Sequence, residues 1–167
     1  MIAEECEKYI YRIPRDAYVE PKDYSKQRFS CYDFFKSVYQ FVTRNFEGAI
    51  TLDFPERFDG TVNISPRGFA YFIRVLLAEV FGNALVKTHF TVSDNEISFT
   101  LSVPEDLKCI STLRSVAERS GFLFEAEKGK IILRTESLYD ATLYVYAHDI
   151  LRFINYLYEV FLNIPNE

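Results

Sequence analysis

The sequence predicts an α+β protein in two layers, with helices packed on one face of a mixed sheet. Three observations favour this fold class. A long apolar helical pattern runs over residues 66–87, short strand patterns flank it on both sides, and a second helical pattern over 107–120 leads into a further strand pair. The length of 167 residues, with 49% hydrophobic and 26% charged residues, suits one globular domain with a substantial core.

The central helix is predicted over residues 66–87. Pro66 suits a first helical turn, and Ser65 before it is a good N-cap. One apolar stripe contains Phe69, Phe72, Ile73, Leu76, Val80 and Ala84. Asn83 falls inside this stripe and Glu79 lies one turn earlier on its edge, so the two polar groups share a face. Their burial costs free energy unless a backbone group, a water or a ligand bonds to them.

Elements on the two sides of this helix are predicted from strand alternation, helical spacing and turn residues. Before it come a strand at 9–13, a polar loop at 15–27, a helix at 31–46 capped by Ser30, and strands at 49–54 and 61–64. After it come a hairpin of 88–92 and 97–103, a helix at 107–120 ended by Gly121, a hairpin of 122–127 and 130–135 around Lys128-Gly129, and a C-terminal helix at 140–162. Ile97, Phe99, Leu101 and Val103 are expected on one side of their strand.

Composition excludes several classes of function. A net charge of -5 argues against a nucleic-acid partner, because phosphate binders normally carry a basic patch. The three cysteines are odd in number and lack metal-ligand spacing, which fits a reducing cytoplasm. The acidic start has no apolar core typical of a signal peptide, and no apolar run reaches membrane length, so no membrane partner is expected.

The order of these elements resembles the ATP-binding domain shared by sensor histidine kinases, DNA gyrase, heat-shock chaperones and mismatch-repair ATPases, the GHKL superfamily. The resemblance covers about residues 29–136. Its best block is Thr61 to Leu85, where Asn83-Ala84 stands in the place of the family's N-box Asn-Ala. A second block, Cys109 to Thr135, is similar to the last helix and hairpin of a histidine kinase domain. The resemblance implies three regions: an extension at 1–28, the ATPase-like domain at 29–136, and a helical extension at 137–167.

The resemblance also implies roles for particular residues. The family's N-box Asn binds magnesium beside the nucleotide phosphates, which points to Asn83, and a Glu four residues earlier is the general base in the gyrase and chaperone branches, which points to Glu79. The family's adenine-binding D-x-G-x-G should follow the strand at 97–103, where this chain reads LSVPEDLK. Asp106 or Glu105 stands near the lost Asp.

The glycines of the family's nucleotide site are missing. The six glycines, at 48, 60, 68, 82, 121 and 129, form no G-x-G, and only a few residues separate Pro104 from the next helix. A phosphate cradle of backbone N–H groups needs such glycines. We therefore expect a degenerate domain that acts as a non-catalytic signalling or protein-interaction module, with vestigial roles for Glu79, Asn83 and Asp106 and no cofactor. The alternative is an active ATP-binding kinase or ATPase with an altered loop, in which Asn83 holds the magnesium of Mg-ATP.

Two histidines and the C-terminal helix complete the candidates. We expect His89 to have a structural role and not a role in proton transfer. His148, in a His-Asp pair followed by Arg152, loosely resembles the phospho-acceptor box of histidine kinases, but an exposed helix histidine is the stronger interpretation. The predicted C-terminal helix carries an a/d seam with steps of four and three: Leu143, Ala147, Ile150, Ile154, Leu157 and Phe161. This seam predicts either docking on the chain's own domain or binding to a protein partner, most simply in a homodimer.

Overall fold

The computed structural model describes residues 20–30, 32–34, 36–37, 40, 50–53, 60–80, 86–92, 96–136, 138–139, 153, 155–157 and 159–160. Side chains are described at these positions except 50–53, 60, 77–80, 86–92 and 138–139. The predicted strand at 9–13 lies outside the described residues. Of the predicted helix at 31–46, residues 32–34, 36–37 and 40 are described, and all are helical.

Eight strands in the described part of the chain form two sheets. The larger sheet has the order β2-β4-β5-β7-β6 and contains β2 (Ile50–Asp53), β4 (Val86–Val92), β5 (Glu96–Ser102), β6 (Leu123–Glu127) and β7 (Lys130–Glu136). It is mixed, because β2 pairs with β4 in parallel and the other pairs are antiparallel. The smaller sheet has the order β1-β3-β8, with β1 (Gln27–Ser30), β3 (Gly60–Ile64) and β8 (Leu138–Tyr139) all antiparallel.

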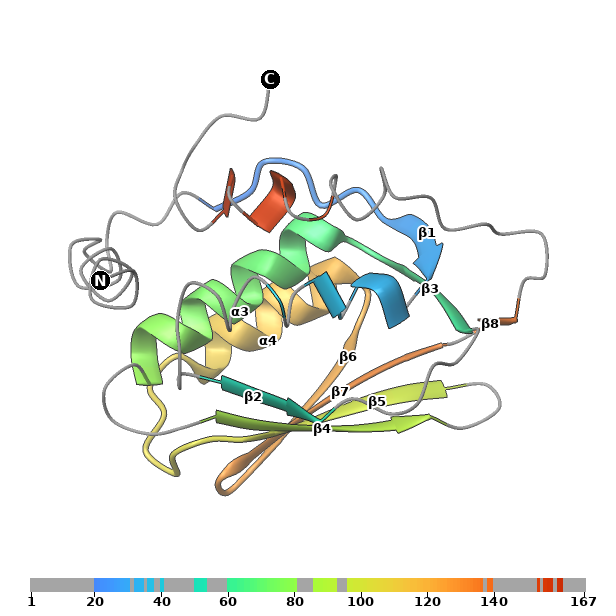
Figure 1. Ribbon diagram of the computed structural model, residues 1–167. Helices are drawn as coiled ribbons and strands as arrows, with labels where there is room; N and C mark the ends of the chain where they lie inside the picture. The colour runs from blue at the N-terminus through green and yellow to red at the C-terminus, as the bar shows by residue number, and fades with distance from the viewer. Residues whose placement is uncertain are drawn as a thin grey trace, which may run out of the picture.

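Two helices, α3 (Pro66–Val80) and α4 (Ile110–Ser120), lie together across one face of the larger sheet (Figure 1). Along β5, Ile97, Phe99 and Leu101 are buried and Val103 packs partly buried against the same core, as the alternation predicts. The α+β class is therefore confirmed for the described residues. The chain also carries the predicted hairpin turn at Lys128-Gly129, where Gly129 has a φ of 77°.

The start of α3 is joined to the end of α4. The Ser65 hydroxyl accepts the Gly68 N–H at 3.0 Å, which confirms the predicted N-cap. The Ser65 N–H donates to the Ser120 carbonyl at 2.8 Å, and Gly121 then ends α4 with a φ of 107°. Gly68 lies directly against the Ser120 side chain, so a side chain at position 68 has no room. The two helices therefore cross at a close backbone contact.

Helix α3 is buried on both of its sides. Every residue from Gly68 to Leu76 is buried. On the sheet side, the Phe69 ring lies 6.1 Å from that of Phe99 and 5.6 Å from that of Phe122. The same ring also lies 5.3 Å from that of Phe34. The core therefore continues from the sheet past α3 to β1 and the helical residues that follow it.

Two predicted boundaries and one predicted pairing were wrong. Helix α3 is described from Pro66 to Val80 and does not extend to residue 87, because Val86 and Lys87 pair as strand with β2 and β5. Residues 61–64 do not join the mixed sheet, since β3 pairs instead with β1 and β8. Helix α4 begins at Ile110 rather than at 107, because Leu107 and Cys109 belong to a connection that packs partly buried against the core.

Strands β1 and β8 were missed. Gln27, inside the predicted loop, begins β1, and the boundary drawn between residues 28 and 29 falls within this strand. The chain reaches β8 immediately after residue 137 and pairs back onto β3, with Leu138 opposite Thr61. Neither strand has a local sequence signal of its own, because each is short and is specified by its pairing with β3.

Helical residues near the C-terminus belong to the same core. Phe153, Tyr156, Leu157 and Val160 are buried, whereas Asn155 is exposed. The Phe153 ring lies 4.9 Å from that of Phe29 and 5.2 Å from that of Phe34. Figure 1 shows the helical segment near the C-terminus, in red, on the side of α3 away from the large sheet. Of the two alternatives predicted for the C-terminal helix, docking on the chain's own domain holds for these residues, because Phe29 of β1 and Phe34 supply an aromatic surface for Phe153.

We predict that Phe153→Ala lowers the free energy of unfolding of the whole chain by about 3–5 kcal/mol, since it empties a fully packed aromatic site. The exposed neighbour is the matched control, and Asn155→Ala should change the free energy by less than about 0.5 kcal/mol. Urea unfolding followed by circular dichroism measures both variants. Equal, small effects of the two substitutions would mean that the C-terminal residues are not part of the domain core.

Candidate functional site

The structure places the sequence-predicted site residues at separate points of the fold. Glu79 lies in the last turn of α3, at a position whose side chain is not described. Asn83 and His148 lie outside the described residues, so the structure does not test whether Glu79 and Asn83 meet. Asp106 is exposed in the turn between β5 and α4. His89 lies within β4, opposite Thr100 of β5.

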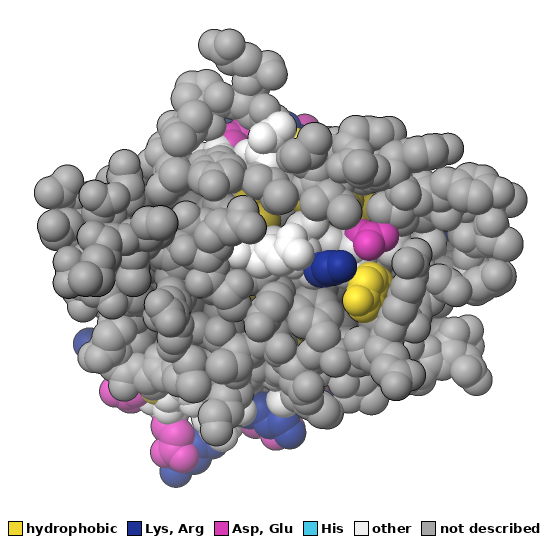
Figure 2. Space-filling view, in the orientation of Figure 1, with side chains coloured by type: hydrophobic (Ala, Val, Ile, Leu, Met, Phe, Trp, Pro, Cys, Tyr) yellow, Lys and Arg dark blue, Asp and Glu magenta, His cyan; other side chains and the backbone are white. Residues whose placement is uncertain are grey.

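The connection between β5 and α4, residues 103–109, is fully described and is tied to its neighbours. The Val103 N–H donates to the Gly129 carbonyl at 3.0 Å, and the Lys128 ammonium lies 3.6 Å from a Glu105 carboxylate oxygen. Val103, Leu107 and Cys109 pack partly buried against the core. Figure 2 shows the charged side chains of both signs gathered at the lower edge, where the β6–β7 hairpin ends. The connection therefore runs as a short anchored turn from strand to helix.

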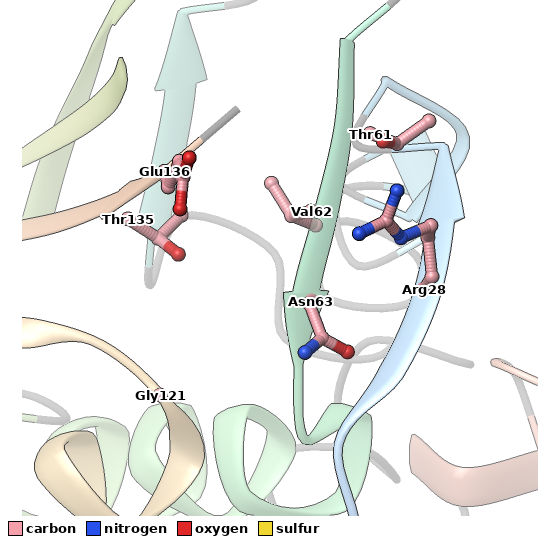
Figure 3. A pocket seen from close by; sticks show the side chains of 7 residues that line it. All are labelled: Arg28, Thr61, Val62, Asn63, Gly121, Thr135 and Glu136. Atoms are coloured by element: carbon pink, nitrogen blue, oxygen red, sulfur yellow. The ribbon is translucent and has the colours of Figure 1, made fainter. Parts of the chain in front are cut away.

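A polar hollow of about 220 Å³ lies where the two sheets diverge. Its lining comes from β1, β3, the end of α4 and the end of β7: Arg28, Thr61, Val62, Asn63, Gly121, Thr135 and Glu136. Figure 3 shows Thr135 and Glu136 on one side of β3 and Arg28 on the other. Sequence reasoning named none of these residues as part of a site. Arg28 and Asn63 become neighbours only through the β1–β3 pairing, and β1 itself was not predicted.

The charges around this hollow are unevenly paired. Arg134 takes part in two ion pairs, at 2.7 Å with Glu125 and at 3.9 Å with Glu96. Glu136 stands directly opposite Glu96 in the β5–β7 register, which places two like charges side by side. Within the described part of the chain, neither Arg28 nor Glu136 takes part in an ion pair. One positive and one negative group therefore line the hollow without a counter-charge.

Two arginines hold the segment 20–27 and the C-terminal helical residues against α3 and α4. Arg67 lies 3.6 Å from Asp23 and 3.3 Å from Glu159, and its guanidinium stacks 4.4 Å from the centre of the Tyr156 ring. Arg119 binds Glu20 and stacks 4.0 Å from the centre of the Tyr24 ring. We call this set of contacts the clasp. It joins the two flanking segments to the helix layer through partly exposed charges, each worth little by itself.

Two groups of the clasp titrate away from their ordinary values. The Ser25 hydroxyl and backbone N–H both donate to the Asp23 carboxylate, and this holds the pKa of Asp23 below its usual value. Partial burial raises the pKa of Tyr24 well above its usual value, and the hydrogen bond that Tyr24 donates to Glu20 at 2.9 Å acts in the same direction.

Among the described residues, no group of His, Cys, Asp and Glu could hold a metal ion. The helices of the described part include none with both the length and the apolar character needed to cross a membrane. Comparison of the chain with protein-family models found no match, and comparison with curated proteins found none either.

We predict that Tyr24 makes the protein less stable at high pH. Because the pKa of Tyr24 is raised in the folded state, its protonated hydroxyl stabilises the fold fully below the pKa of an unfolded tyrosine, about 10. This stabilisation is lost as the pH rises above that value. Tyr24→Phe should therefore show a shallower fall in melting temperature than the wild type above about pH 10. Glu20→Gln removes the charge that accepts the Tyr24 hydrogen bond, and it should also make the fall in melting temperature shallower. Parallel pH profiles for wild type and Tyr24→Phe would contradict the assignment.

Proposed function

We propose that this chain is a degenerate histidine kinase-like ATPase domain of the GHKL type, and that it acts as a non-catalytic signalling or protein-interaction module. The order of elements supports the first part. Along the chain, β2, β3, α3, β4, β5, α4, β6 and β7 follow one another in the order on which the resemblance depends. Helices α3 and α4 lie on one face of a mixed sheet, and Glu79 lies at the end of α3 nearest the N-box position.

The β5–α4 connection is the observation that carries the loss of catalysis. In the family, this region begins with the adenine-binding D-x-G-x-G and continues into a glycine-rich lid around the triphosphate. In this chain residues 103–109 contain a proline and no glycine, and both ends of the connection are anchored. Without glycines, backbone N–H groups cannot approach phosphates closely enough to cradle them. Asp106 lies exposed in this turn, with no adjacent glycine to bring a nucleotide against it.

We predict no binding of Mg-ATP at micromolar concentration, because adenine recognition and phosphate cradling both depend on the missing motifs. Isothermal titration calorimetry of the full chain with Mg-ATP and Mg-ADP measures this directly. A ligand specific for the folded state would also raise the melting temperature. A tight, magnesium-dependent site that is lost in Asn83→Ala would establish an active ATP-binding domain instead.

The C-terminal helical residues support the interaction part of the proposal. Their buried positions, Phe153, Tyr156, Leu157 and Val160, fall on one side of the helix. Leu157 is the seam residue that the structure describes, and the domain's own core contains it. The other seam residues lie outside the described residues. Their spacing in the sequence is the support for a contact with a second helix.

We predict a homodimer formed through this seam. Ile154→Asp should then yield a folded monomer, because a charge in the seam breaks helix–helix packing. Sedimentation velocity gives the oligomeric state, and a melting curve shows whether the domain core is intact. Asn155→Asp, at an exposed position, is the matched control and should leave the dimer unchanged. A wild-type chain that stays monomeric at high concentration would contradict the homodimer.

A further inference from the structure

The polar hollow lies at the opposite end of the helix layer from the N-box position. Strand β3, which forms its floor, leads through Ser65 directly into the first turn of α3. Glu79 lies in the last turn of the same 15-residue helix, so α3 alone separates the two places by about 20 Å. The hollow is therefore a different place from the one that a nucleotide would occupy in the family that the chain resembles, and the resemblance assigns a nucleotide role to none of its lining residues.

Polar groups with unused bonding capacity surround the hollow. Among the described residues, the side chains of Arg28, Asn63, Thr135 and Glu136 make no hydrogen bond or ion pair with one another or with other described groups. Arg28 offers five N–H donors in a planar fork that matches a carboxylate. Glu136 offers only acceptors. Figure 3 shows these two side chains on opposite sides of β3, so a ligand lying across this strand would meet both.

The neighbourhood of Glu136 favours a cation. Its cross-strand partner Glu96 repels it, and Arg134, the nearest cation in the register, is engaged with Glu125 and Glu96. A positive group beside Glu136 would offset this repulsion. On the other side, a negative group beside Arg28 would supply its missing counter-charge. An anion alone would pair with Arg28 but add to the repulsion at Glu136. A cation alone would pair with Glu136 but leave Arg28 without a counter-charge.

We propose that the hollow binds a small zwitterion, an aminocarboxylate of amino-acid size, with its carboxylate on Arg28 and its ammonium on Glu136. The Asn63 amide and the Thr135 hydroxyl also line the hollow and complete its polar lining. The volume of about 220 Å³ is below the roughly 300 Å³ at which sites for drug-sized ligands begin, and it limits the ligand to a small solute. Binding of such a metabolite would give a non-catalytic domain a chemical signal to report.

The test uses aminocarboxylates of increasing length: glycine, β-alanine and γ-aminobutyrate. Acetate and butyrate carry the negative end alone, and methylammonium and butylammonium carry the positive end alone. Titration of the ¹⁵N-labelled full chain, followed by amide chemical shifts, should give saturable changes at Arg28, Asn63, Gly121 and Glu136 with at least one zwitterion. The single-ended probes should bind at least about tenfold more weakly than that zwitterion.

Variants assign the two ends of the ligand. Arg28→Gln and Glu136→Gln should each weaken zwitterion binding at least about tenfold. Arg114→Gln and Glu127→Gln remove the same charges from exposed positions outside the hollow and should leave the affinity unchanged. Melting curves check that all four variants are folded. The proposal is overturned if no aminocarboxylate gives saturable shifts at millimolar concentration, or if acetate binds as well as the zwitterions and Glu136→Gln has no effect.

Discussion

The burial of α3 on both of its sides is the constraint on which the rest of this structure depends. A helix on a single sheet needs one apolar stripe, but α3 is buried over every residue from Gly68 to Leu76. Phe69 of α3 contacts Phe99 of the large sheet and also Phe34, and Phe34 packs with Phe29 and Phe153. The last three rings come from segments far apart in the sequence. The N-terminal strand, the following helical residues and the C-terminal helical residues are thus bound into one core by the same helix.

This arrangement explains the high aromatic content, 16 Phe and 12 Tyr. Phe69 contacts Phe34 on one side and Phe99 and Phe122 on the other, in tilted and edge-on geometries that aromatic pairs favour. The clasp of Arg67 and Arg119 then closes the outside of this core, with guanidinium groups stacked on Tyr156 and Tyr24. Exposed ion pairs add little stability, so the aromatic contacts beneath them supply most of the docking free energy.

The same architecture separates the two places where function is proposed. One end of α3 leads toward the β5–α4 turn, which our proposal takes as the place of a lost nucleotide site. The other end begins at the polar hollow, where Arg28 and Glu136 remain without counter-charges among the described residues. Between the two ends, Phe69 of α3 contacts Phe34, which in turn contacts Phe153 of the C-terminal helical residues.

Local sequence patterns determined the parts of this protein whose structure depends on near neighbours. The Ser65 cap, the Gly121 helix end, the turn at Lys128-Gly129 and the inward residues of β5 each follow from a few adjacent side chains, and all are as predicted. Tertiary structure alone decided the rest. Strands β1 and β8 exist because β3 pairs with both, and the split into two sheets follows from that pairing. The end of α3 is set by strand pairing at Val86. The hollow forms only because β1 lies beside β3 and the end of β7 lies near both strands. Its charged groups are more than 100 residues apart in the sequence, so no local pattern connects them.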